Sequence, residues 1–108
     1  MKAVSVSMPA EANPLIEVLS QLRNVEEAGA FMRDLLTEGE LLEFSRRWSA
    51  AQMLSQSIPY SQICEETGLS TATIARISKW LSSGAGGYQM MLKRIDRSNR
   101  RKAQHHRS

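Results

Sequence analysis

The stretch of sequence that decides the fold is YSQICEETGLSTATIARISKWL, residues 60–81. Pro59 before it suits a first helical turn, and Gly68 within it accepts the left-handed conformation of a helix end. Ser70 can cap a second helix directly afterwards. Two short helices joined by a glycine-containing turn are typical of a helix-turn-helix. We therefore predict a helix-turn-helix over residues 60–81.

The side chains of this motif divide into an inner and an outer set. Cys64 is the small residue where the two helices should cross, and the expected core residues are Ile63, Thr67, Leu69, Ile74 and Ile77. The outer set of the second helix is Ser70, Thr71, Ala72, Ala75, Arg76 and Lys79. Short hydroxyl and methyl side chains can approach base edges in a major groove, and cations can meet phosphates. An ordinary helical hairpin is the alternative, but a merely solvated helix usually carries long charged side chains.

The rest of the chain also predicts helices, so the fold class is all-α. Asn13 and Asn24 should cap the first and second helices, and the capping box of Thr37 and Glu40 should start a third that Pro59 halts. The third helix should turn one apolar face to the core, carrying Leu41, Phe44, Trp48, Ala51, Leu54 and Ile58. A last helix should follow the glycine-rich break at residues 84–87.

The net charge of +3 over 108 residues is unevenly distributed. Residues 1–92 hold 7 Lys and Arg against 10 Asp and Glu, whereas residues 93–108 hold 7 against 1. Such a tail is either an electrostatic arm for a polyanion or a solvated, disordered end. The single cysteine excludes an internal disulfide, and no apolar run suits a signal peptide or a membrane span. We therefore expect a soluble, cytoplasmic protein without a membrane partner.

Several residues resemble those of the Trp repressor superfamily, and in particular of its YerC/YecD branch. They are Leu36-Thr37, Arg47, the string ETGLSTATIAR at residues 66–76 and the segment GAGGY at residues 84–88. The resemblance covers about residues 15–95. It implies a six-helix fold in which two chains intertwine their N-terminal helices and each offers one helix-turn-helix to double-stranded DNA. We then expect a disordered N-terminus at 1–12, a Trp-repressor-like DNA-binding domain at 13–95 and a basic disordered tail at 96–108.

The resemblance also implies roles for individual residues in DNA binding. Thr37 and Arg47 would lie beside the DNA backbone or an effector pocket. Tyr60, Ser61 and Cys64 would lie near DNA. The residues implied to face bases are Thr71, Ala72, Thr73 and Ala75.

An effector pocket is implied as well, but with two departures. Arg47 and Arg76 match the arginines between which the tryptophan repressor holds an indole ring. Where tryptophan-binding members have a glycine and a small serine, this chain has Ile77 and Trp80. We therefore expect a vestigial pocket, no tryptophan corepressor and no other small-molecule effector. Trp80 either fills the pocket itself or is an ordinary core or surface residue.

These observations favour a sequence-specific transcriptional regulator, a repressor, that acts as a homodimer and needs no cofactor. A dimer is expected because the N-terminal helices carry more apolar surface than one domain of this size can bury. The apolar stripes of these helices include Leu15, Leu19, Phe31 and Leu35. The alternative is a non-specific nucleic-acid-binding or helical interaction module held by its basic tail.

An enzyme is not expected, because no pair of nucleophile and base is suggested. His105 and His106 lie at the end of the tail, and a lone Cys64 at a helix crossing is typical of a core residue. No metal site is expected either.

Overall fold

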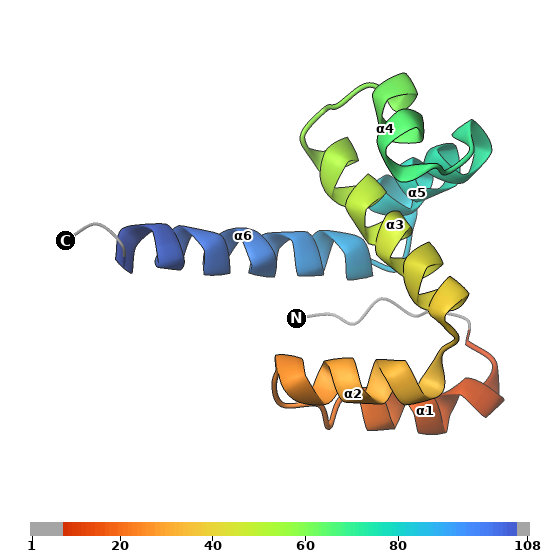
Figure 1. Cartoon of the computed structure of the whole chain (residues 1–108), viewed down its shortest axis with the longest axis vertical. Helices are drawn as coiled ribbons and strands as arrows, with labels where there is room; N and C mark the ends of the chain where they lie inside the picture. The colour runs from red at the N-terminus through yellow and green to blue at the C-terminus, as the bar shows by residue number, and fades with distance from the viewer. Residues whose placement is uncertain (1–7, 106–108) are drawn as a thin grey trace. The chain divides into compact units, whose positions relative to one another are not determined.

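The structure, a computed structural model, describes residues 8–105 and contains only helices in that range (Figure 1). A short 3-10 helix, η1 (Ala10–Ala12), precedes six α-helices: α1 (Asn13–Leu19), α2 (Val25–Leu35), α3 (Glu38–Ser55), α4 (Tyr60–Thr67), α5 (Thr71–Ser83) and α6 (Gly87–His105). The predicted all-α class is confirmed. The disorder predicted for residues 1–7 and 106–108 lies outside the described residues, as does His106.

The chain forms two compact units, Met1–Ser45 and Arg46–Ser108. The first holds η1, α1, α2 and the beginning of α3. The second holds the remainder of α3 and the helices α4 to α6, and therefore the whole predicted helix-turn-helix.

Two helices of the first unit begin at the caps that the sequence predicts. The side chain of Asn24 accepts a hydrogen bond of 2.8 Å from the amide of Glu27. The amide of Glu40 donates to the Thr37 hydroxyl at 3.1 Å, and the Thr37 amide donates to the Glu40 carboxylate at 2.9 Å. These bonds to Thr37 favour the carboxylate and lower the pKa of Glu40. The predicted capping box is therefore confirmed.

The start of α1 differs from the prediction by one residue. Asn13 is the first helical residue, Ala12 is the N-cap and no side chain caps the helix. The reason is that the chain already turns within η1, where the amide of Ala12 donates to the carbonyl of Pro9 at 2.9 Å. Residues 10–12, for which we predicted disorder, are thus helical.

The first unit leaves much apolar surface exposed. None of the described residues 8–45 is fully buried. Ile16 and Val18 of α1 are 46% and 45% exposed, and Val25 at the start of α2 is 81% exposed. Phe44, predicted on the core face of α3, is 47% exposed. Periodicity gives the helix face on which Phe44 lies, but it does not say which element covers that face at each turn.

The end of α3 also differs from the prediction. The helix ends at Ser55, and Ser57 adopts a left-handed backbone conformation with φ 61°. The amide of Ile58 donates to the carbonyl of Met53 at 3.1 Å, which closes the turn. Pro59 therefore serves as the N-cap of α4 rather than as the residue that halts α3.

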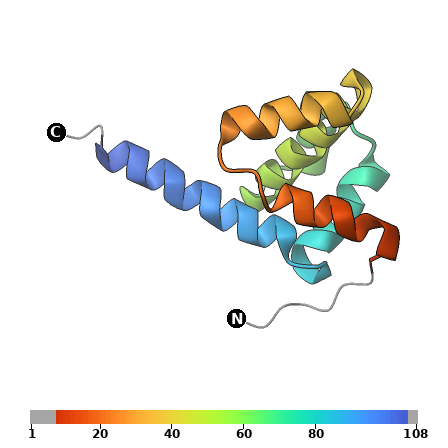
Figure 2. The same ribbon diagram turned by 90° about the horizontal axis from the view of Figure 1, so that it is seen from below.

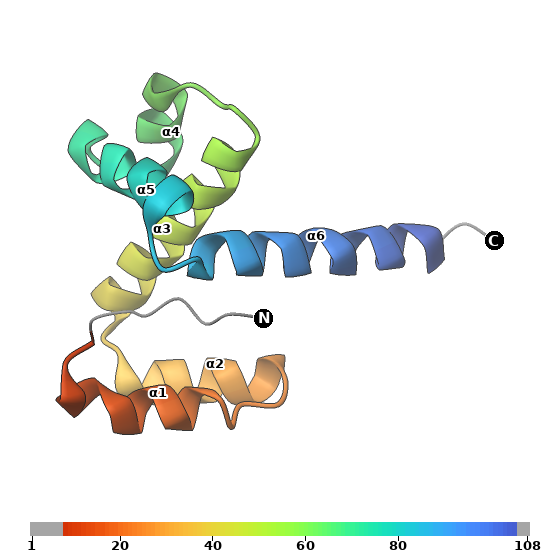
Figure 3. The same cartoon turned by 180° about the vertical axis from the view of Figure 1, so that it is seen from behind.

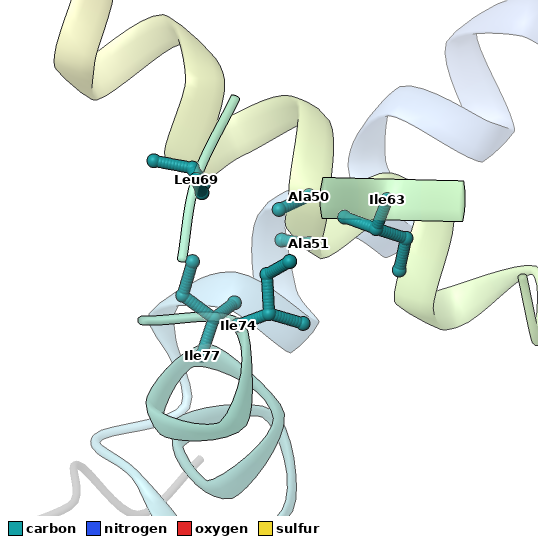
Figure 4. Close-up of a cluster of buried hydrophobic side chains, with 6 residues drawn as sticks. All are labelled: Ala50, Ala51, Ile63, Leu69, Ile74 and Ile77. Carbon is teal, nitrogen blue, oxygen red and sulfur yellow. The ribbon is translucent and has the colours of Figure 1, made fainter. Parts of the chain in front are cut away.

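The core of the second unit joins α3, α4 and α5. Its buried residues are Ala50, Ala51, Ile63, Leu69, Ile74 and Ile77 (Figure 4). The two alanines let the neighbouring helices approach α3, while the three isoleucines are fully buried and fill the space between them. Burial of such side chains stabilises a fold by about 1.5 to 3 kcal/mol each. All five inner residues predicted for the helix-turn-helix are buried, Thr67 included.

The last helix is longer than predicted. The sequence predicts a disordered tail from residue 96, but α6 continues to His105 (Figure 2). Residues 93–105 contain no glycine or proline, and six of these thirteen residues are Arg or Lys, which favour helix. An ion pair of 3.3 Å between Asp96 and Arg100, four residues apart, adds support. High charge alone was therefore a poor indicator of disorder here.

Candidate nucleic-acid interface

The turn between α4 and α5 has the geometry of a helix-turn-helix. The two helices lie against each other, and both pack on α3 (Figure 3). Gly68 ends α4 with φ 76°, in the left-handed region that side chains with a Cβ rarely adopt. The buried hydroxyl of Thr67 donates to the carbonyl of Ile63 at 2.7 Å and accepts from the amide of Leu69 at 3.2 Å. The polar groups of the buried turn are thus paired, which fixes the angle at which α5 leaves it.

The outer face of α5 is exposed and carries only small side chains as far as Ala75. Ser70 caps the helix by accepting a hydrogen bond of 3.1 Å from the amide of Thr73. The other exposed residues predicted for this face are Thr71, Ala72, Ala75, Arg76 and Lys79. Ile74 and Ile77 on the opposite side are fully buried. The core therefore holds α5 by one face and leaves the small side chains and the two cations to solvent.

Thr73, for which the resemblance implies a base contact, lies beside the cap of α5. It is half-buried, and its hydroxyl lies 3.0 Å from the hydroxyl of Ser70. Its contact with a base stays a prediction.

The first helix of the motif, α4, also carries residues that are predicted to lie near DNA. Tyr60 and Ser61 are exposed at the start of α4. Cys64 is half-buried, and its sulfur lies 3.5 Å from the Thr71 hydroxyl, in a contact in which either group can donate. This contact joins α4 to the exposed edge of α5 and fits the predicted position of Cys64 at the helix crossing.

The residues of the predicted vestigial pocket lie on two helices, α3 and α5. Arg47 on α3 is half-buried, whereas Arg76 on α5 is exposed. Ile77 is directed into the core and is 0% exposed (Figure 4). Trp80 is 44% exposed at the surface of α5, which agrees with the second of its two expected roles.

An aromatic pair, Trp48 and Tyr88, lies beside Arg47. This pair was not predicted from the sequence. The rings of Trp48 and Tyr88 stack with centroids 6.4 Å apart and an interplanar angle of 13°. Partial burial raises the pKa of Tyr88, and the positive charge of Arg47 offsets part of that rise. The signal was present: Trp48 was placed on the core face of α3, and Tyr88 directly follows the glycine-rich break. The stack attaches the first turn of α6 to α3.

The described part of the chain lacks two other kinds of functional feature. Among the side chains described, residues 8–103, no three His, Cys, Asp or Glu residues gather as metal ligands would. None of the helices described combines the length and the apolar composition that crossing a membrane requires.

Comparison with known proteins places this fold and this motif in one family. The model of the Trp repressor protein family matches residues 10–96. YerC of Bacillus subtilis is 36% identical over 85 residues, which cover 79% of this chain and 82% of YerC. A TrpR-like protein from Eubacterium eligens superposes with a TM-score of 0.73 at 34% identity, covering 82% of this chain and 91% of that one. A candidate Trp repressor from Staphylococcus aureus gives a TM-score of 0.73 at 36% identity, covering 82% and 89%. The resemblance drawn from the sequence is confirmed, and the chain belongs to the Trp repressor family.

Proposed function

We propose that this chain is a sequence-specific DNA-binding regulator of transcription, a repressor, that reads DNA with the outer face of α5. Membership of the Trp repressor family supports DNA binding and regulation. The observation that carries the proposal is the division of α5 between a buried isoleucine face and an exposed face of small side chains followed by cations.

The chemistry of this face suits a major groove. The hydroxyl of Thr71 can donate to or accept from a base edge, and the methyl groups of Ala72 and Ala75 can contact thymine methyl groups. Arg76 and Lys79 follow one turn later, where they would meet phosphates and fix the register of the helix. Tyr60 and Ser61 at the start of α4 would contact the sugar-phosphate backbone beside it, helped by the positive end of the helix dipole.

We also propose that the protein acts as a homodimer. The exposed side chains of Ile16, Val18 and Val25 are the apolar surface that a second chain would cover. Two copies of the helix-turn-helix related by a two-fold axis would reach successive major grooves about 34 Å apart. The preferred site should therefore be a near-palindrome with half-sites about ten base pairs apart.

A non-specific nucleic-acid-binding module is the second candidate, because α6 carries a strong excess of positive charge. The two functions differ in sequence preference, since contacts to phosphates carry no sequence information. Selection of bound duplexes from a random pool separates them.

Substitutions on the outer face of α5 should weaken that preference. Thr71→Ala removes a hydrogen-bonding group, and Ala75→Gln adds a side chain that holds the helix away from the groove. Each should cost about 1 to 3 kcal/mol of discrimination between the selected duplex and a scrambled one. Ser82→Ala, at an exposed site near the other end of α5, is the control and should change nothing. Equal binding of both duplexes by the unmodified chain would contradict the regulator function.

Free tryptophan should not act as a corepressor. Ile77 is held in the core and Trp80 stands one turn after Arg76, where tryptophan-binding relatives are expected to have a glycine and a serine. Forcing extra volume into a packed site costs about 1 to 3 kcal/mol even after relaxation. A DNA-binding titration with and without millimolar tryptophan should therefore give the same dissociation constant. A tenfold gain in affinity on adding tryptophan would refute this expectation.

A further inference from the structure

The cations of α6 gather on one side of the helix. Five of them recur at steps of three or four residues and are exposed; this basic stripe consists of Lys93, Arg94, Arg97, Arg100 and Arg101. The stripe spans nine residues, Lys93 to Arg101, or about 12 Å of helix at 1.5 Å rise per residue. Lys102 is also exposed, but it continues the opposite series of Tyr88, Leu92, Ile95 and Asn99.

The opposite side of α6 is attached to the rest of the second unit. Tyr88 stacks on Trp48. The side-chain amide of Gln89 donates a hydrogen bond to the carbonyl of Leu81. Leu92 lines one groove together with Leu54 and Leu81, and Lys93 of the basic stripe also lines it. These contacts hold one side of α6 against the rest of the unit, while all five cations of the basic stripe remain exposed.

We propose that the basic stripe is a second DNA-contacting surface, which binds the phosphate backbone without regard to sequence. The inference rests on the proposed DNA-binding function and adds a second element to it. A continuous helix holds the cations in a fixed row, so they lose less conformational freedom on binding than a disordered arm would. The ion pair between Arg100 and Asp96 is exposed, so a phosphate can replace the carboxylate.

A phosphate backbone fits this helix better than an anionic membrane does. A helix that lies in a membrane surface buries an apolar face along its length. The apolar side chains of α6 lie in its first half, up to Ile95. Of residues 96–103, Ala103 is the only apolar one. The half of α6 with the densest positive charge therefore has no apolar face to insert.

The test compares two variants that each remove one cation from opposite sides of α6. Arg97→Ala removes a cation from the basic stripe, and Lys102→Ala removes one from the other side. The measurement is the slope of log affinity against log salt for full-length protein and a selected duplex. Arg97→Ala should flatten the slope by about 0.9 per subunit, the value for one phosphate contact. Lys102→Ala should leave the slope unchanged, and neither variant should alter the ranking of duplexes.

A third variant tests whether phosphate binding by the basic stripe depends on the helical structure of α6. Ser98→Pro keeps every charge but interrupts α6 within the basic stripe. It should flatten the slope by about 0.9 to 1.8 per subunit, because Arg100 and Arg101 would no longer be aligned with Arg97. Circular dichroism should show a loss of helix, and the thermal transition of the remainder should persist.

Several results would overturn the proposal. Equal slopes for Arg97→Ala and Lys102→Ala, with no effect of Ser98→Pro, would indicate a disordered charged arm. Binding to phosphatidylserine vesicles that Arg97→Ala abolishes, with an unchanged DNA slope, would indicate a membrane partner. Failure of the proposed regulator function would appear as a lack of preference among duplexes. That result is distinguishable from failure of the basic stripe, because the salt slopes of the variants can be compared on any duplex.

Discussion

Replacing Ile77 with Gly lowers the free energy of unfolding by about 3 to 6 kcal/mol, the largest loss of stability that we expect from one substitution. Ile77 lies on α5, is 0% exposed and packs in the core with buried residues of α3 and α4. Truncating a buried isoleucine to alanine costs about 2 to 5 kcal/mol, because the apolar contacts are lost and a cavity remains. A glycine within a helix adds about 1 kcal/mol to that cost. Small domains are stable by about 5 to 15 kcal/mol, so this variant should be only marginally folded.

Two further variants separate the loss of core packing from the cost of a glycine within a helix. Urea unfolding measures the free energy of unfolding of all three variants. Ala75→Gly, at an exposed site of the same helix, isolates the glycine cost and should lose about 1 kcal/mol. Ile77→Val removes one methylene from the core and should lose about 0.5 to 1.5 kcal/mol. If Ile77→Gly cost no more than Ala75→Gly and also gained affinity for tryptophan, Ile77 would fill a ligand slot and would not be part of the core.

The helix-turn-helix could be predicted closely because its signals are local. Pro59, Gly68 and Ser70 act through their own backbone or through bonds to residues three or four positions away. The spacing of Ile63, Ile74 and Ile77 assigns them to one side within a short motif. The bounds of α4 and the buried set were therefore predicted without any knowledge of distant contacts.

Features that no single local signal decides were predicted less well. The end of α3 is set by the left-handed Ser57 and the bond from Ile58 to Met53, which compete with a helix that could continue to Pro59. The stack of Trp48 on Tyr88 joins residues 40 positions apart, and neither local spacing nor charge indicates which aromatic residues will meet.

The candidate site shows the same division. The exposed residues of α5 follow from helical periodicity, and the structure places Thr71, Ala75 and Arg76 outward as predicted. The resemblance implies a base-facing Thr73 and a pocket-filling Ile77, and both roles stay predictions; the Thr73 hydroxyl lies beside the Ser70 hydroxyl of the cap, and the Ile77 side chain is buried. The position of a residue gives its place on the backbone, whereas local packing sets the direction of its side chain.

Replacing Ile16 with Asp should convert the proposed homodimer into monomers and lower affinity for a palindromic duplex by about 10² to 10⁴. Ile16 is 46% exposed on α1, on the apolar surface that we assign to the second chain. A buried, unpaired carboxylate there would cost far more than the contacts of one isoleucine contribute. Loss of the dimer separates the two helix-turn-helix motifs, so the second half-site is no longer bound at the high effective concentration that linkage provides.

Sedimentation at micromolar protein concentration and a binding titration measure the two effects together. Ile16→Leu keeps the apolar area and should remain dimeric with unchanged affinity. Ile16→Asp should keep the thermal transition of the second unit, because the buried residues of that unit's core lie between Ala50 and Ile77. Its residual binding should be the same for a full palindrome and for a single half-site, since one motif can occupy only one half-site. A monomeric unmodified chain that still prefers the full palindrome would contradict the dimer and would require one chain to contact both half-sites.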